Sequence, residues 1–311
     1  MESVSCIFCN RPSSDVAINE NGFQGRRCVP CGLIYISPRP SPADTTQLYT
    51  EDHAGLYADA QLHFEGFKQK EANEAIRLIK KFTKGGTLLE LGAGGGAFLT
   101  AARNAGFAPY AIELNPIEAS WITEELNIPC ESVAIGTDSF GGKKFDVVYH
   151  RDVLSHLHDP IGTFRLIHQS LRDKGLLVFE TGNIADVNPK YLGLFSQFLY
   201  PDHLFFFGEH SIRLLLQDTG FRYVKVHRIS LLLPLLVEKA LWRLKDRLKD
   251  GESRKIQGTA SGLQTTNGSG STVKRRVRLL YRYASHYLSK IGEVLPKREW
   301  PLKLVVVAEK Q

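Results

Sequence analysis

The sequence lacks the features that would carry a chain into or across a membrane. No cationic segment followed by an apolar one opens it, which argues against a cleaved secretory signal. The longest apolar run, 229–237, is interrupted by Ser230 and Pro234 and is too short to span a bilayer. The composition, 43% hydrophobic and 23% charged over 311 residues, is typical of a globular protein. We therefore expect a soluble, cytoplasmic protein with one main domain and appendages.

Cysteine is nearly absent beyond the first 31 residues, where only Cys130 occurs. The other four cysteines form two Cys-x-x-Cys pairs separated by 18 residues, a spacing typical of zinc ribbons. Disulfides are the alternative, but a cytoplasmic chain keeps its thiols reduced. Four thiolates would also close the coordination sphere of the metal, so the zinc would be structural and not catalytic. The predicted Zn²⁺ ligands are Cys6, Cys9, Cys28 and Cys31.

A glycine-rich turn, 88–99, is the most informative motif. An apolar run ends in Glu90, and Gly92, Gly94 and Gly96 follow at alternate positions before an apolar helix-like stretch. This order predicts a buried strand that turns tightly into a helix, with backbone open to a ligand. No Gly-Lys-Ser/Thr follows, which excludes a P-loop, and the acid precedes the glycines, unlike the usual dinucleotide fingerprint.

Further strands and helices alternate downstream of this turn. The segment 109–113 reads as a strand that ends in Glu113, at the place where an acid binds ribose hydroxyls in Rossmann-type folds; a surface carboxylate is the alternative. Strands are also expected at 145–150 and 175–180, with a helix over 161–172 between them. The alternation predicts a parallel sheet with helices on both faces and a ligand site at the carboxyl ends of its strands.

Together, residues 88–230 resemble the class I S-adenosylmethionine-dependent methyltransferases. The stretch Asp-Val-Leu-x-His-Leu-x-Asp-Pro at 152–160 is similar to a subgroup of them. The resemblance implies an α/β fold, a Rossmann-like doubly wound seven-stranded sheet whose last strand is antiparallel, with S-adenosylmethionine at the glycine turn. The residues expected to bind this cofactor are Glu90, Gly92, Ala93, Gly94, Gly96, Glu113, Leu114 and Arg151.

Histidine suits a proton acceptor near neutral pH. His150 ends the fourth strand and is expected to point into the cleft, so it is the first candidate for the catalytic base. His203, in a stretch similar to the Glu-His-Leu-x-x-Phe of the related group but with Asp202 in place of the glutamate, is the second. Asp152 is either a surface carboxylate or a partner of the base. His156 is interpreted as a structural histidine.

Charge is unevenly distributed along the chain. Residues 231–311 contain 17 Lys and Arg against 7 Asp and Glu, while residues 1–230 contain 22 against 26. Most of the basic residues lie in 231–298, where the resemblance leads us to expect only a short turn between the last two strands. The segment 231–298 is basic and amphipathic. Such a segment can bind an anionic membrane surface or a nucleic-acid backbone, or it can form a helical hairpin that packs on the domain.

These observations predict five segments. They are a zinc ribbon at 1–45, a helical cover at 46–84, a methyltransferase core at 85–230, a helical insertion at 231–298 with a flexible linker at 251–272, and the last strand of the core at 299–311. In the cover segment, Tyr57, Phe64 and Phe67 would either cover the cofactor or pack the helix on the sheet.

A ribbon ahead of this glycine motif resembles a bacterial group that includes sugar methyltransferases. The resemblance implies a saccharide acceptor, nucleotide-activated or lipid-linked, methylated on a hydroxyl or a carbon. A lipid-linked acceptor would explain the basic amphipathic insertion, through which (231–298) we expect peripheral association with an anionic membrane. The alternatives are a ribosomal-RNA methyltransferase, which the net negative charge of residues 1–230 disfavours, a quinone or lipid methyltransferase, and a cofactor-binding scaffold without catalysis.

Overall fold

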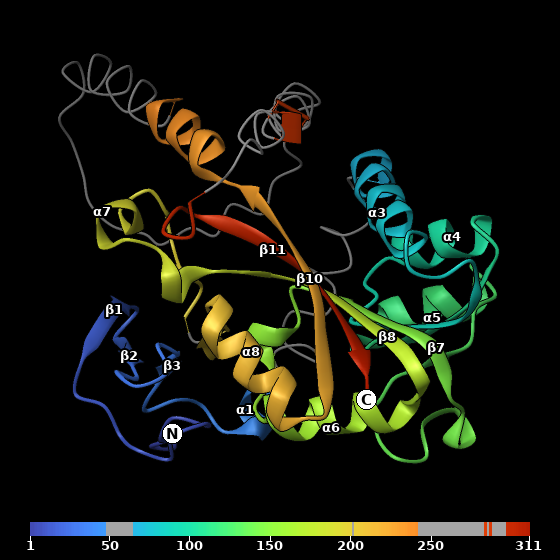
Figure 1. Ribbon diagram of the computed structural model, residues 1–311, viewed down its shortest axis with the longest axis horizontal. Coiled ribbons are helices and arrows are strands. Elements are labelled where there is room, and N and C mark those ends of the chain that lie inside the picture. The colour runs from blue at the N-terminus through green and yellow to red at the C-terminus, as the bar shows by residue number, and fades with distance from the viewer. Residues whose placement is uncertain (48–64, 201, 242–282, 285, 288–296) are drawn as a thin grey trace, which may run out of the picture.

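The computed structural model describes residues 1–47, 65–200, 202–241, 283–284, 286–287 and 297–311 (Figure 1). Within this part of the chain, no helix is long and apolar enough to cross a membrane. The predicted linker 251–272, and Tyr57 and Phe64 of the cover segment, lie outside the described residues.

A seven-stranded sheet forms the centre of the molecule, with the strand order β10-β11-β8-β7-β4-β5-β6. β11 is antiparallel to both of its neighbours, while β4, β5, β6, β7 and β8 run parallel. The predicted fold, a Rossmann-like sheet with an antiparallel last strand, is confirmed. The strands are β4 (Gly86–Leu91), β5 (Phe107–Ile112), β6 (Cys130–Glu131), β7 (Phe145–Arg151), β8 (Leu171–Gly182), β10 (Phe221–Ser230) and β11 (Leu302–Lys310).

Helices cover both faces of this sheet because its central strands are apolar on both sides. Alanine, isoleucine and phenylalanine side chains of α3 and α4 pack on one face, and α5 lies beside them; α6 and α8 pack on the other face (Figure 1). The helices are α1 (Pro42–Gln47), α3 (Glu65–Ile79), α4 (Ala97–Asn104), α5 (Pro116–Glu124), α6 (Pro160–Ser170), α7 (Pro189–Leu192) and α8 (Glu209–Asp218), with short 3₁₀ turns η2 (Ser139–Gly142), η3 (Leu154–His156) and η4 (Ile184–Asp186).

β8 begins at Leu171, four positions before the expected strand start at 175, and α6 ends accordingly at Ser170. The reason is a register irregularity in the pairing with β7: Leu171 pairs with Phe145, and Leu176 then pairs with Val147.

A second, four-stranded sheet lies at the N-terminal end of the chain, in the order β1-β2-β3-β9. The first three strands, β1 (Val16–Glu20), β2 (Phe23–Arg27) and β3 (Ile34–Ile36), come from the cysteine-containing segment. The fourth, β9 (Phe205–Phe206), comes from the loop that follows β8. The small sheet therefore shares a strand with the loop region above the carboxyl edge of the large one.

Candidate functional site

The glycine turn between β4 and α4 has the backbone that its sequence predicts. Gly92, Gly94 and Gly96 have φ values of 68°, 52° and 75°, in the left-handed region that favours glycine. A Cβ atom on Gly92 would lie 2.7 Å from Cγ2 of Val153. The turn thus presents bare backbone at these positions, and the space that a side chain would need beside Gly92 is filled by Val153.

Glu90 lies directly before this turn at the carboxyl end of β4 and is only 4% exposed. Its Oε2 atom has no hydrogen-bond partner among the described residues. Burial raises the pKa of this carboxyl well above its usual range, the charge of Arg151 opposes the shift, and that of Glu113 adds to it. A buried oxygen without a partner requires an explanation, and the ammonium group of S-adenosylmethionine is a chemically suitable partner.

Glu113 follows β5 and is buried at the same edge of the sheet. Its carboxylate accepts hydrogen bonds from the backbone N–H of Gly94, at 2.7 Å, and of Asn115, at 2.9 Å. The carboxylate therefore lies against the glycine turn, although its binding to a ribose stays a prediction. The predicted neighbours Ala93 and Leu114 belong to the same two loops.

Arg151 ends β7 and donates to Oε2 of Glu71 in α3, at 3.0 Å. Asp152 follows with a φ of 56°, and burial raises the pKa of its carboxyl while Arg151 lowers it. Both residues lie at the carboxyl end of β7, where cofactor and acceptor meet in folds of this type.

A buried polar network beside Arg151 was missed by the sequence analysis. Tyr149 donates to Oε1 of Glu180 at 2.9 Å, and Nζ of Lys303 lies 2.9 Å from Oε2 of Glu180. Burial favours the neutral form of Glu180, but the charges of Lys303 and Arg151 hold its pKa below the ordinary value. The available signal was Lys303, which directly precedes the apolar run 304–308 of the terminal strand. A pocket of about 490 Å³ adjoins the network, lined by Glu71, Glu180, Arg228 and Lys303 among others.

His150 does not point into the cleft, contrary to our expectation. It is 1% exposed, and its ring stacks on Phe179 with centroids 5.0 Å apart and meets Phe164 edge-on. Neither ring nitrogen has a hydrogen-bond partner in the described part of the chain. Burial lowers the pKa of His150 to about 3, so the ring is neutral. The side chain shares the α6 face of β7 with Val148, because residues two apart on a strand point the same way.

His203, the second candidate base, lies beside His156 and Asp202 above the carboxyl edge. The two imidazole rings have centroids 4.6 Å apart, and Nδ1 of His156 lies 3.3 Å from Oδ1 of Asp202. Burial and the neighbouring His156 lower the pKa of His203, which leaves a neutral imidazole at pH 7. The fold thus brings His203, the second candidate for the base, next to His156, which we had interpreted from the sequence as a structural histidine.

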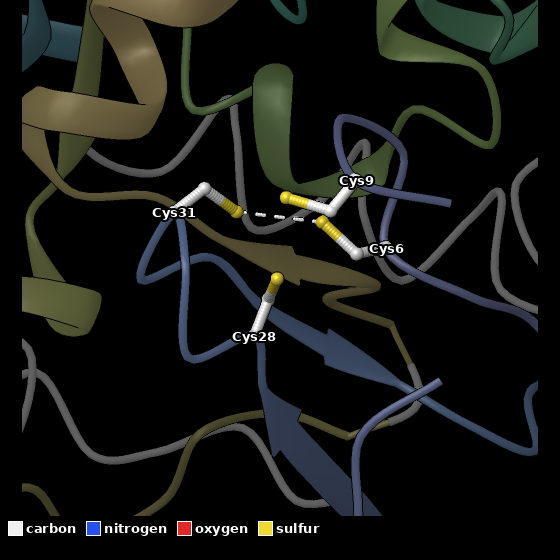
Figure 2. Close-up of side chains that lie close together, drawn as sticks. All are labelled: Cys6, Cys9, Cys28 and Cys31. Carbon is white, nitrogen blue, oxygen red and sulfur yellow. Dashed lines mark hydrogen bonds between the residues drawn. The ribbon is translucent and has the colours of Figure 1, made fainter. Parts of the chain in front are cut away.

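The four N-terminal cysteines converge, as Figure 2 shows, with their sulfur atoms pointing toward a common centre. All four sulfurs lie within 4.8 Å of one another, and those of Cys6 and Cys31 are 3.4 Å apart. Each pair sits on a similar tight turn: Asn10 N–H donates to Cys6 O, and Gly32 N–H donates to Cys28 O. This donor set and its convergence suit a tetrahedral metal ion.

Comparisons with known proteins agree with this geometry. The family model described as "Methyltransferase domain" matches residues 64–226, and the chain belongs to that family. A search of curated proteins found no significant match. A SAM-dependent methyltransferase from Archaeoglobus fulgidus superposes with a TM-score of 0.50 at 18% identity, covering 83% of this chain and 100% of that one. Phosphoethanolamine N-methyltransferase 2 from Haemonchus contortus gives 0.49 at 15% identity, covering 89% and 61%.

The protein is therefore a class I methyltransferase that uses S-adenosylmethionine as its cosubstrate. Bound at the glycine turn, S-adenosylmethionine would supply an electrophilic methyl group. The chain's own residues would hold the cofactor and orient the acceptor. For a hydroxyl acceptor, one of them would also accept the proton that the hydroxyl loses.

Proposed function

We propose that the protein methylates a hydroxyl or a carbon of a saccharide, either nucleotide-activated or lipid-linked, with the cysteine cluster holding a structural Zn²⁺ ion. The observation that carries the proposal is the polar lining of the carboxyl edge around the glycine turn. Arg151, Glu180 and Lys303 form one group of polar side chains there, and Asp202 and His203 belong to a second. A polyhydroxylated acceptor offers hydrogen bonds to such groups, whereas a quinone ring would leave many of them unpartnered.

The charge of residues 1–230 argues against the RNA alternative. These residues as a whole carry more acidic than basic side chains. A phosphate backbone is bound through Lys and Arg, so this acidic balance disfavours it. We assign proton acceptance to the group of His203, His156 and Asp202, since the His150 ring is enclosed by aromatic side chains.

The insertion 231–298 is proposed to hold the enzyme at an anionic membrane surface. In its described part, a helix over 232–241 exposes Leu233, Leu236 and Leu241 by 37%, 46% and 52%. Exposed leucines beside a basic segment suit insertion among lipid head groups. Near the C-terminal end of the insertion, Nε2 of His286 lies 3.2 Å from Oε1 of Glu74 in α3. The ammonium group of Lys70 lies over the Tyr287 ring, 4.0 Å from its centroid. These contacts support the packing of that part on the core domain.

The first experiment measures S-adenosylmethionine binding by calorimetry and then the transfer of labelled methyl to four acceptors. These are nucleotide sugars, polyprenyl-linked saccharides, a quinol and ribosomal RNA. Label in a saccharide supports the proposal, and label in RNA or quinol overturns it. The variant His203→Ala should lower turnover by about 10² or more with cofactor affinity retained, as expected for loss of a proton acceptor.

Membrane association is tested by co-sedimentation with vesicles that contain phosphatidylglycerol. Replacing Leu236 and Leu241 by serine should reduce the bound fraction, because both side chains are exposed and apolar. Val133→Ser is the matched control, since Val133 is 59% exposed but lies far along the chain from the insertion. Equal sedimentation of all three proteins would contradict the membrane proposal.

A further inference from the structure

Three side chains with metal-ligand chemistry meet outside the cysteine cluster. His156 belongs to the turn η3 after β7, and Asp202 and His203 belong to the loop before β9. Their ligand atoms all lie within 4.8 Å of one another. The side chains of His156 and Asp202 are 22% and 26% exposed, so an ion can reach them from solvent.

Hydrogen bonds to the backbone orient both imidazole rings. Nδ1 of His203 lies 2.8 Å from the carbonyl oxygen of Phe198, and Nδ1 of His156 lies 3.0 Å from that of Asp202. A carbonyl oxygen only accepts, so Nδ1 carries the proton in each ring and Nε2 carries the lone pair. Metal-binding histidines usually have this arrangement, in which the nitrogen remote from the metal donates to a carbonyl or carboxylate.

The two loops are also joined to each other, which holds the three side chains in place. The backbone N–H of Leu204 donates to the carbonyl of Ser155 at 2.8 Å, directly beside His203 and His156. The N–H of His203 donates to the carbonyl of Leu199 at 3.0 Å. These bonds fix the backbone of the two loops, so that binding an ion at Nε2 of both rings would need only the Asp202 carboxylate to rotate from its place 3.3 Å from Nδ1 of His156.

We propose that His156, Asp202 and His203 form a second metal site, which binds a divalent first-row transition cation such as Mn²⁺, Fe²⁺ or Co²⁺. Two imidazoles and one carboxylate are the donor set of sites that keep open coordination positions. The cysteine cluster differs in kind, because its four sulfurs would complete a tetrahedral shell.

The role of this ion rests on the proposed function. Val153, three residues before His156, lies against Gly92 of the glycine turn, which places η3 beside that turn. A saccharide hydroxyl bound at an open position would lose its proton to water more readily. The resulting alkoxide oxygen would bond to the methyl carbon as the carbon–sulfur bond breaks, and the sulfonium would leave as the neutral thioether S-adenosylhomocysteine. His203 would then act through the ion that it binds.

The test is a titration of the full chain, with one zinc ion already bound at its cysteines, with CoCl₂ followed by calorimetry and absorption. We expect one further Co²⁺ ion per chain, without the thiolate-to-cobalt charge-transfer band that a cysteine site produces. His203→Gln and Asp202→Asn should each weaken this binding by about tenfold or more. The matched control is His158→Ala, a histidine of the same loop outside the group, which should bind Co²⁺ as the wild type does.

Absence of a second Co²⁺ ion would overturn the proposal, as would binding that the two ligand variants leave unchanged or a charge-transfer band. S-adenosylmethionine binding and methyl transfer to a saccharide are measured on the same samples. If Co²⁺ binds but no saccharide is methylated, the proposed function fails and the metal site stands. If the site stays empty while a saccharide is methylated, the metal site fails and the proposed function stands.

Discussion

Tyr35 of β3 pairs with Phe205 of β9, and the next residues along, Ile34 and Phe206, pair as well. β3 follows the second cysteine pair, and β9 begins two residues after His203. The cysteine cluster and the loop that carries His203 are therefore joined by one small sheet. Whatever stabilises the cluster should therefore also stabilise the loop that carries His203.

Removing one cysteine should consequently affect turnover as well as stability. In Cys28→Ser we expect the loss of the bound zinc and a Tm lower by about 5 °C or more, because a structural zinc site contributes folding free energy. The turnover number should fall while S-adenosylmethionine affinity is retained, since the glycine turn lies on β4. Zinc analysis, thermal unfolding and calorimetry measure these effects.

Cys130→Ser is the control for this experiment, because Cys130 lies in β6, outside the cluster. It should keep one zinc ion per chain and normal turnover. Full activity of a zinc-free Cys28→Ser protein would contradict the coupling between the cluster and the acceptor loop.

Gly92→Ala should weaken S-adenosylmethionine binding by about tenfold or more, which corresponds to ~1.4 kcal/mol. The new Cβ would lie 2.7 Å from Val153, and alanine at a φ of 68° is strained. Gly136→Ala is the control, since a Cβ there meets nothing within 4 Å. Equal affinities of the two variants in calorimetry would show that this turn is not the cofactor site.

The glycine turn and the sheet could be predicted because their signals are local. Apolar runs of strand length specify β4, β5 and β7 without reference to the rest of the chain, and the first two are followed directly by Gly92 and Glu113. The side on which His150 lies could not be predicted in this way. Since both faces of a central parallel strand are apolar, alternation does not reveal which helix layer a residue faces.

The polar groups of the site depend on contacts between distant segments. Glu180 meets Lys303 across β8 and β11, and His156 meets Asp202 through two loops that a two-residue strand, β9, holds together. A strand so short has no periodicity to detect. Local propensity therefore does not predict these pairings, because they depend on tertiary packing.

Glu90→Gln should stabilise the unliganded protein and weaken cofactor binding. Burial raises the pKa of Glu90 in the folded state, so its ionisation opposes folding. Below about pH 4.3, the pKa of glutamate in the unfolded chain, the carboxyl of Glu90 is protonated in both states and does not reduce the free energy of unfolding of the wild type. As the pH rises from there toward the folded pKa, the free energy of unfolding falls. The Tm advantage of the variant should therefore be smallest near pH 4 and grow toward about pH 8.

Added S-adenosylmethionine should make the Tm of the wild type higher than that of Glu90→Gln. The carboxylate of Glu90 would then have an ammonium partner, and the amide of the variant would not. The wild type measured at the same pH values, with and without the cofactor, is the reference for both comparisons. A constant Tm difference for Glu90→Gln would show that burial does not raise the pKa of Glu90 in the unliganded protein.

His150→Phe separates the two histidine hypotheses. The imidazole lies between Phe164 and Phe179 with both nitrogens unpartnered in the described structure, and a buried polar group without a hydrogen bond costs about 1–3 kcal/mol. A phenyl ring removes this cost but is larger, and overpacking a core costs about 1–3 kcal/mol, so the two effects offset each other. We therefore expect little change in Tm and a turnover within about twofold of the wild type. If His150 were the base, its loss would lower turnover by about 10²–10⁴. Steady-state kinetics with the acceptor that is methylated, beside the His203→Ala variant, decide between these outcomes. A large loss of turnover confined to His150→Phe would identify His150 as the base.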